Sequence, residues 1–218
     1  MNIQSTRNTD RDQHQADFVK QLIQSSSGLS GNHAVIKQYE ASLAAFFNVN
    51  HAVAISSGTA SIYCSLMALN IKRGDVVIVP VTGAVMTCLP LITLGATPLF
   101  VDCSKDSFAI CPTHLRKLLQ AHDNIKAIIS VSMWGYPGLS HTVKSICKYY
   151  QLPIIEDAAQ AIGSKTDGVY EGAYGTLGCF STHEIKLIST GEGGFVLTND
   201  DELAHRLKVV SRLGINKE

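Results

Sequence analysis

The residue of this chain that points most directly to chemistry is Lys186, which stands five residues before the turn-forming run Gly-Glu-Gly-Gly at 191–194. Most lysines are solvated surface charges, and that is the alternative interpretation. The apolar side chains around it are Phe180, Ile185, Leu187 and Ile188. From them we expect a buried segment, in which the ammonium form is disfavoured and the free amine can attack a carbonyl group.

A second candidate is Asp157, which follows the short apolar strand predicted over residues 153–156. Ligand sites of α/β proteins usually lie at such strand ends. A carboxylate that faces the nitrogen of a heterocyclic ring favours the protonated ring. Gln160, three residues later, could donate a hydrogen bond to an oxygen on the same ring. The alternatives are a helix N-cap for Asp157 and a solvated side chain for Gln160.

The third candidate is the run Ser-Gly-Thr-Ala-Ser at 57–61, which follows an apolar strand and opens a predicted helix. The first amides of a helix favour an anion, and a phosphate is one such anion. Gly58 permits close approach of the backbone, and Thr59 adds a hydroxyl donor. Ser181 could also reach a phosphate. The alternative is an ordinary strand-to-helix turn with a serine or threonine cap, and the run is neither a Walker A loop nor a GxGxxG fingerprint.

A lysine, a strand-end aspartate and a phosphate loop are the parts that a pyridoxal 5′-phosphate site needs. The chain resembles the DegT/DnrJ/EryC1/StrS family of sugar aminotransferases over residues 31–214, approximately. Three motifs carry the resemblance: Ser-Gly-Thr-Ala at 57–60, Glu-Asp-Ala-Ala-Gln at 156–160, and Phe-Ser at 180–181 leading to Lys186 and the Gly-Glu-Gly-Gly run. Similar segments also occur at 72–80, 95–102 and 134–137.

The resemblance implies a pyridoxal phosphate-dependent aminotransferase in which Lys186 is catalytic. This residue would hold the cofactor as an internal aldimine and would then transfer a proton as general base and acid. The amino group would pass from glutamate or glutamine to a keto-sugar, expected to be nucleotide-linked. The cofactor-binding residues implied are Gly58, Thr59, Ala60, Asp157, Gln160, Ser181 and Lys186.

The chain departs from the family pattern in several places. Family members usually place an aromatic ring after a Pro-x-Thr sequence, but here Pro80-Val81-Thr82 is followed by Gly83, so we expect the stacking contact to be missing. Glu184 and Leu187 also replace the usual proline and asparagine around the lysine.

The family continues into a smaller C-terminal domain, so we expect this chain to be a fragment, one half of a split enzyme or a reduced protein. A homodimer, or a hetero-oligomer with a chain that supplies the missing part, is expected. Two alternatives to transamination remain open. One is a non-catalytic subunit that completes a site with another chain, and the other is a different pyridoxal reaction on the same scaffold.

Apolar runs of strand length alternate with helical patterns, which predicts an α/β protein: a three-layer α/β/α sandwich with a mostly parallel sheet, as in the fold type I large domain. Residues 1–33 are expected to form a polar arm, and residues 34–218 a single cofactor-binding domain. The expected helices cover 34–47, 58–69, 84–94, 113–120, 141–150 and 200–213. The expected strands cover 52–56, 76–79, 98–101, 126–132, 153–156, 179–181 and 195–198.

Composition narrows the function classes. The 18 basic and 18 acidic residues cancel, so no electrostatic feature favours nucleic acid or an anionic membrane as partner. The six cysteines and eight histidines show no ligand spacing, so no metal is expected.

No apolar signal core opens the chain, which makes a cytoplasmic location the default expectation. Residues 76–101 carry no charge, but their prolines and glycines divide them into pieces too short to span a membrane.

Overall fold

The computed structural model describes residues 9–25, 31 and 33–212. The chain falls into two compact units, Met1–Tyr39 and Glu40–Glu218. The first contains helix α1 (Thr9–Gln24) and the start of helix α2 (Ala34–Phe47). Helix α1 was not foreseen, because its sequence is mostly polar, although Ala16, Val19 and Ile23 recur at helical spacing in its second half. Residues 1–8, 26–30 and 32 of the expected polar arm lie outside the described residues, and the arm boundary at residue 33 stays a prediction.

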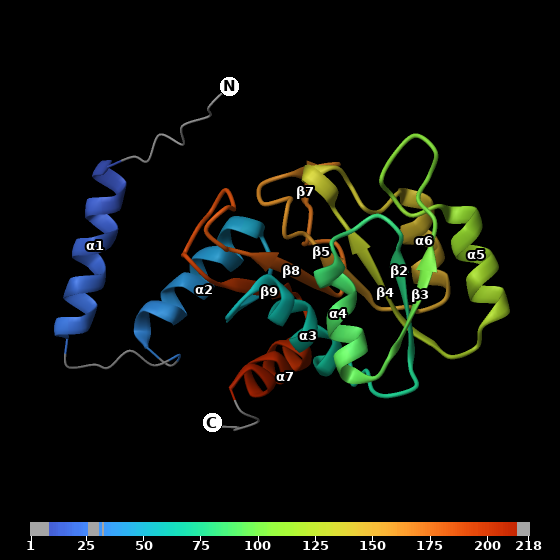
Figure 1. Cartoon of the computed structure of the whole chain (residues 1–218), viewed down its shortest axis with the longest axis horizontal. Coiled ribbons are helices and arrows are strands. Elements are labelled where there is room, and N and C mark those ends of the chain that lie inside the picture. The colour runs from blue at the N-terminus through green and yellow to red at the C-terminus, as the bar shows by residue number, and fades with distance from the viewer. Residues whose placement is uncertain (1–8, 26–30, 32, 213–218) are drawn as a thin grey trace. The chain divides into compact units, whose positions relative to one another are not determined.

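The second unit is built on a seven-stranded sheet with strand order β1-β9-β8-β5-β4-β2-β3 (Figure 1). Its strands pair in parallel except β9, which is antiparallel to both of its neighbours, β1 and β8. The predicted mostly parallel sheet is therefore confirmed. The strands are β1 (His51–Ile55), β2 (Val76–Pro80), β3 (Thr97–Val101), β4 (Ile125–Val131), β5 (Ile154–Asp157), β8 (Leu177–Ser181) and β9 (Gly194–Thr198).

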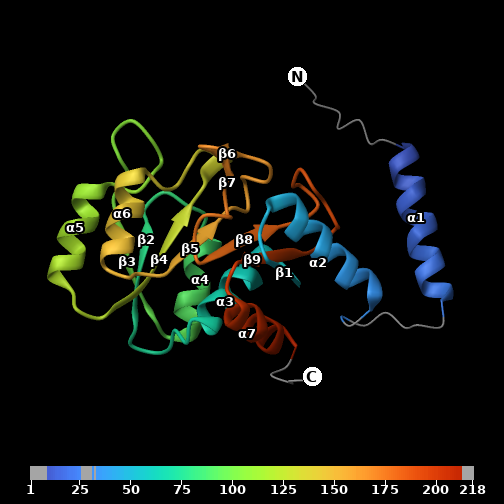
Figure 2. The same cartoon turned by 180° about the vertical axis from the view of Figure 1, so that it is seen from behind.

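Helices cover both faces of this sheet, which gives the predicted three layers (Figures 1 and 2). The helices are α3 (Gly58–Ala68), α4 (Val85–Leu94), α5 (Pro112–Ala121), α6 (His141–Tyr149) and α7 (Asp201–Ser211). Helices α3, α4 and α7 share one core with Val77 and Ile129, whereas α5 and α6 share the other with Ile78 and Ile128. Successive strand residues thus point to opposite cores, which is why these strands are apolar throughout.

The end of α2 closes the face over β8 and β9 with aromatic rings. Phe47 lies 4.9 Å from Phe180 and 5.8 Å from Phe195, measured between ring centroids. Phe180 and Phe195 stack on neighbouring strands with centroids 4.5 Å apart. These contacts anchor β8, the strand that leads to Lys186.

Other details follow or extend the sequence-based expectations. Asp200, the first residue of the helix expected over 200–213, caps α7, because its Oδ1 accepts from the Leu203 amide at 2.9 Å; the expected end of that helix at residue 213 lies outside the described residues. A short hairpin was not foreseen; it is formed by two strands of two residues each, β6 (Lys165–Thr166) and β7 (Val169–Tyr170). Its turn residues, Asp167 and Gly168, both have positive φ, as a tight hairpin requires.

Within the described residues, none of the helices combines the length and the apolar character needed to cross a bilayer. The same part of the chain contains no group of three or more histidine, cysteine, aspartate or glutamate side chains placed to hold a metal ion.

Candidate active site

The start of α3 combines a serine cap with free backbone donors. Ser57 has an extended backbone, and its Oγ accepts from the Ala60 amide at 3.1 Å, so the ordinary capping role is real. This bond occupies the amide of Ala60, which is not among the residues that line the pocket described below. The amides of Gly58 and Thr59 have no acceptor among the described residues. The positive end of the helix therefore keeps two donors for an anion.

Gly58 is required by packing as well as by its place at the helix start. A Cβ atom at Gly58 would lie 2.7 Å from Cβ of Ser181 on β8. A Cβ at Gly194 would lie 2.5 Å from the carbonyl oxygen of Phe180. The first turn of α3 and the ends of β8 and β9 therefore meet at a distance that only glycine allows, which brings Ser181 beside the free amides.

Asp157 is the last residue of β5, and the residue is 7% exposed. Thr87 Oγ1 donates to its Oδ2 at 2.6 Å, and the Ala159 amide donates to its Oδ1 at 3.2 Å. Burial raises the pKa of the Asp157 carboxyl, while the two hydrogen bonds and the charge of Lys186 lower it. The side chain supports a turn instead of capping a helix.

Thr87 is a site residue that sequence analysis missed. It is buried within the apolar helix α4, and its hydroxyl donates a hydrogen bond to Asp157 at the carboxyl end of β5. A threonine hydroxyl inside an apolar helix needs a hydrogen-bond partner, and this need was the available signal.

Lys186 lies on a short loop that is fixed at its base. The Thr182 amide donates to the Gly193 carbonyl at 2.9 Å, and the Thr190 amide donates to the Thr182 carbonyl at 2.8 Å. The hydroxyls of Thr182 and Thr190 are 2.7 Å apart. Within the loop, the Lys186 amide donates to the His183 carbonyl at 2.9 Å. These bonds hold the two ends of the loop together, so that the lysine backbone is fixed relative to β8.

The expectation that Lys186 lies in a buried segment is wrong. Ile185 is 78% exposed and Leu187 is 82% exposed, and only Phe180 of the four apolar neighbours is buried. Lys186 itself is partly exposed. The apolar residues belong to a loop beyond the strand end, where no element covers them. The reactivity of this amine must therefore come from what it faces, not from burial of its segment.

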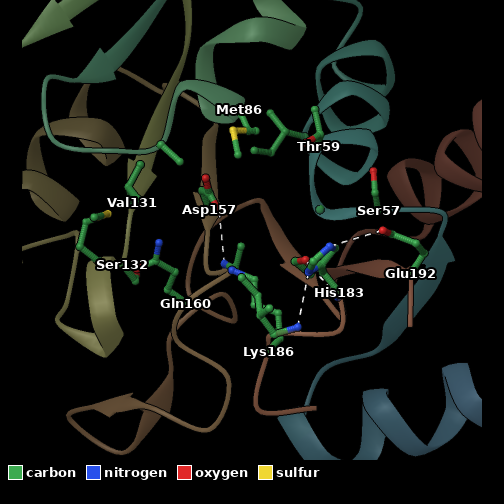
Figure 3. Close-up of a pocket in the computed structure, with 17 residues that line it drawn as sticks. Ser57, Thr59, Met86, Val131, Ser132, Asp157, Gln160, His183, Lys186 and Glu192 are labelled. Atoms are coloured by element: carbon green, nitrogen blue, oxygen red, sulfur yellow. Dashed lines mark hydrogen bonds and ion pairs between the residues drawn. The ribbon is translucent and has the colours of Figure 1, made fainter. Parts of the chain in front are cut away.

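These features converge on one pocket of about 280 Å³, close to the lower end of the range of about 300–1,000 Å³ found for small-molecule sites. It opens at the carboxyl ends of β4, β5 and β8, where ligands of open α/β sheets bind (Figure 3). Six of the seven predicted cofactor-binding residues line it: Gly58, Thr59, Asp157, Gln160, Ser181 and Lys186. Segments about 100 residues apart in sequence are thereby brought together.

The residue of this loop that faces the pocket differs from the one expected to lack the aromatic ring. Gly83 does not line the pocket, whereas Ala84 and Met86 do. A Cβ at Gly83 would instead meet Cγ2 of Val131 at 3.3 Å. Figure 3 shows Met86 entering the pocket from the side opposite Lys186. The position that faces the pocket in this loop is therefore Ala84, and Met86 provides bulk two residues later.

A model of the DegT/DnrJ/EryC1/StrS aminotransferase family matches residues 9–218. The chain belongs to this family. GDP-perosamine synthase of Escherichia coli O157:H7 is 33% identical over 190 residues, which are 87% of this chain and 51% of that protein. The chain thus spans about half the length of the curated relative that it matches.

Two solved structures of relatives are also similar to this chain. DesV of S. venezuelae, in complex with a ketimine intermediate, has a TM-score of 0.86 at 30% identity, covering 95% of this chain and 55% of that one. A GDP-4-keto-6-deoxymannose-3-dehydratase with a trapped PLP-glutamate geminal diamine has a TM-score of 0.85 at 28% identity, covering 97% and 54%. These relatives support the fold assignment and show the class of ligand that related pockets hold.

Proposed function

We propose that this chain is the cofactor-binding part of a pyridoxal phosphate-dependent aminotransferase that acts on a keto-sugar. The observation that carries the proposal is the single pocket in which Lys186, buried Asp157 and the free amides of Gly58 and Thr59 meet. Membership of the family and the pyridoxal ligands of its relatives support it.

The pocket fits the cofactor at both of its ends. The amides of Gly58 and Thr59, with the Ser181 hydroxyl beside them, would hold the phosphate at the helix start. Asp157 would face the ring nitrogen, because each of its oxygens has one protein donor and lone pairs left toward the pocket. When bound, pyridoxal phosphate supplies an aldehyde that accepts an amino group and a ring that withdraws electrons.

Lys186 would act twice. Its Nζ is the group that would hold the cofactor covalently between turnovers, by condensation with the aldehyde and loss of water. As a free amine it would also serve as the general base and acid that moves a proton at the reacting carbon of the substrate. The hydrogen bonds of Thr182 and Thr190 fix the loop that carries it, so the amine stays on one side of the pocket.

Gln160 would have a supporting role. Its Oε1 accepts from the Trp134 amide at 3.2 Å, and no described protein group accepts from its amide nitrogen. This nitrogen can therefore donate to an oxygen on the cofactor ring, as the sequence predicts.

The proposed substrates are glutamate or glutamine as amino donor and a nucleotide-linked keto-sugar as acceptor. One relative was solved with glutamate joined to its cofactor, and another is a GDP-perosamine synthase. The resemblance to the family also implies that related sugar dehydratases carry another residue in place of this lysine, so Lys186 favours amino transfer over elimination.

The proposal is tested by visible absorption of the purified protein after loading with pyridoxal phosphate. We expect a band in the wild type and in Lys208→Ala, a control at an exposed lysine of α7, but not in Lys186→Ala. Glutamate should convert the wild-type band to that of the pyridoxamine form. An equal band in Lys186→Ala would contradict the role of Lys186. A persistent wild-type band in glutamate and glutamine would favour the alternative of a non-catalytic subunit.

A further inference from the structure

A second hollow, of about 430 Å³, adjoins the cofactor pocket and shares Lys186 with it. Trp134, Ile162 and Leu187 line only this hollow, whereas Gln160, Ser181 and Ile185 line both. A molecule in the hollow would therefore lie against Lys186, the residue that also lines the cofactor pocket. A second reactant could occupy this position.

Trp134 is held in a conformation that its own packing does not explain. Its backbone has φ 51° and ψ 27°, in the left-handed region that bulky residues avoid. The Trp134 amide donates to Gln160 Oε1 at 3.2 Å, and its ring meets the Phe108 ring edge-on with centroids 5.2 Å apart. The indole is nevertheless 66% exposed. Strain that holds an aromatic ring in an open position is a feature of ligand-binding sites.

The lining of the hollow restricts what can bind there. Apart from Lys186 it carries no charged side chain, so it offers nothing further to pair with a diphosphate. Trp134 presents a flat ring, Ile185 and Leu187 present aliphatic surface, and Gln160 supplies a polar edge. A hexose ring that lacks some hydroxyls has the same character: a C–H face, an apolar edge and a few polar groups.

We propose that this hollow is the subsite for the sugar ring of the keto-sugar acceptor, with the C–H face of the ring against Trp134. The exposed side chains of Ile185 and Leu187 contact its deoxygenated edge, and the nucleotide lies outside the hollow. This inference rests on the proposed function and adds to it the residues that select the acceptor.

Trp134 is the only tryptophan of the chain, so tryptophan fluorescence, excited at a wavelength that tyrosine does not absorb, reports on this residue alone. The loaded protein without amino donor is titrated with GDP- and TDP-linked 4-keto-6-deoxyhexoses, and with GDP and TDP alone. We expect a saturable change in emission with at least one of the two sugar nucleotides and none with either nucleotide. No change with either sugar nucleotide, or the same change with the nucleotide alone, would overturn the proposal.

Substitutions supply the second arm, measured by calorimetry with the sugar nucleotide that binds more tightly. Trp134→Ala should weaken binding about five- to tenfold, as expected for loss of one aromatic contact, and Trp134→Phe should restore most of it. Tyr136→Ala is the matched control, because Tyr136 is an exposed aromatic two residues away that does not line the hollow. Equal affinity in Trp134→Ala and the wild type, or equal loss in Tyr136→Ala, would contradict the assignment.

The visible band distinguishes failure of the sugar subsite from failure of the proposed function. If Trp134→Ala keeps the wild-type band but also keeps full sugar affinity, the subsite is wrong and the proposed function stands. If the wild type forms no band, the proposed function fails, and this inference fails with it.

Discussion

At the scale of single residues, the site depends on the charge state of Asp157 in its buried position. Burial raises the pKa of its carboxyl, and the hydrogen bonds from Thr87 and Ala159 and the charge of Lys186 limit that rise. A carboxylate that must stabilise a protonated ring has to remain ionised. Thr87, which sequence analysis overlooked, is therefore a positioning residue for the proposed chemistry.

Replacing Thr87 by valine should raise the pKa of Asp157, because it removes the hydrogen bond to the charged form. We expect the acidic limb of the pH profile for cofactor retention to move to higher pH, with little change at alkaline pH. Thr93→Val is the control, since Thr93 is an exposed threonine of the same helix that bonds only to the Leu89 carbonyl. Superimposable profiles for the wild type and Thr87→Val would contradict this role.

The ring-face contact is the second prediction at this scale. Ala84→Phe should place a ring in the pocket and lower the dissociation constant for pyridoxal phosphate by about fivefold, from a stacking contact of about 1 kcal/mol. Met86→Ala should raise it, because the thioether would be lost from the side opposite Lys186. Equilibrium dialysis of the loaded protein measures both.

Gly83→Phe is the control for the ring-face prediction, since position 83 faces Val131 and not the pocket. Tighter binding in Gly83→Phe but not in Ala84→Phe would show that the loop presents the other residue to the cofactor.

At the scale of elements, Glu156 ties the segment after β7 to the sheet. Its Oε1 accepts from the amides of Tyr174 and Gly175, and its Oε2 accepts from the Gly172 amide. Burial raises the pKa of Glu156 to about 6, despite these hydrogen bonds, and the charge of Glu171 adds to the rise. This carboxyl lies beside Asp157 in sequence but is turned away from the pocket, which it does not line.

A raised pKa in the folded state gives stability that is fully present below the ordinary value of 4.5 and is lost as the pH rises through about 6. The loss should be up to about 2 kcal/mol between pH 4.5 and 7.5. Glu156→Gln, which does not titrate, should lack this part of the pH dependence. Urea unfolding at both pH values gives the comparison, and equal pH dependence of the two proteins would contradict the assignment.

At the scale of the whole molecule, α4 presents apolar side chains that the described part of this chain does not cover. Leu89 and Ile92 are 44% and 62% exposed. The resemblance to the family implies association between subunits, and such a surface suits it. We propose that α4 takes part in a contact with a second copy of the chain.

Leu89→Glu combined with Ile92→Glu should therefore convert a dimer to a monomer, as measured by sedimentation velocity. Leu187→Glu, a change at an exposed apolar residue outside α4, is the control and should leave the mass unchanged. If the double variant stays dimeric, or if the wild type is a monomer, α4 is ruled out as the contact.

The sheet and the helices around it could be predicted closely from sequence, because buried parallel strands are short apolar runs and the helices carry caps such as Ser57 and Asp200. The meeting of the three motifs in one pocket could be anticipated from the family resemblance and from their places at strand ends, while their roles toward the cofactor stay a prediction. Three features could not be predicted, because each depends on how separate segments meet in space: the hydrogen bond from Thr87 to Asp157, the lining of the pocket by Ala84, and the exposure of Ile185. The two-residue hairpin strands are too short to show any pattern.

The central claim is that the side chain of Lys186 carries the cofactor. Borohydride reduction of the loaded protein, with any required companion chain present, followed by peptide mass mapping, tests it most directly. The account predicts a pyridoxyl group on the peptide that contains Lys186 and on no other lysine. An unmodified Lys186, or a label only at another lysine, would contradict it.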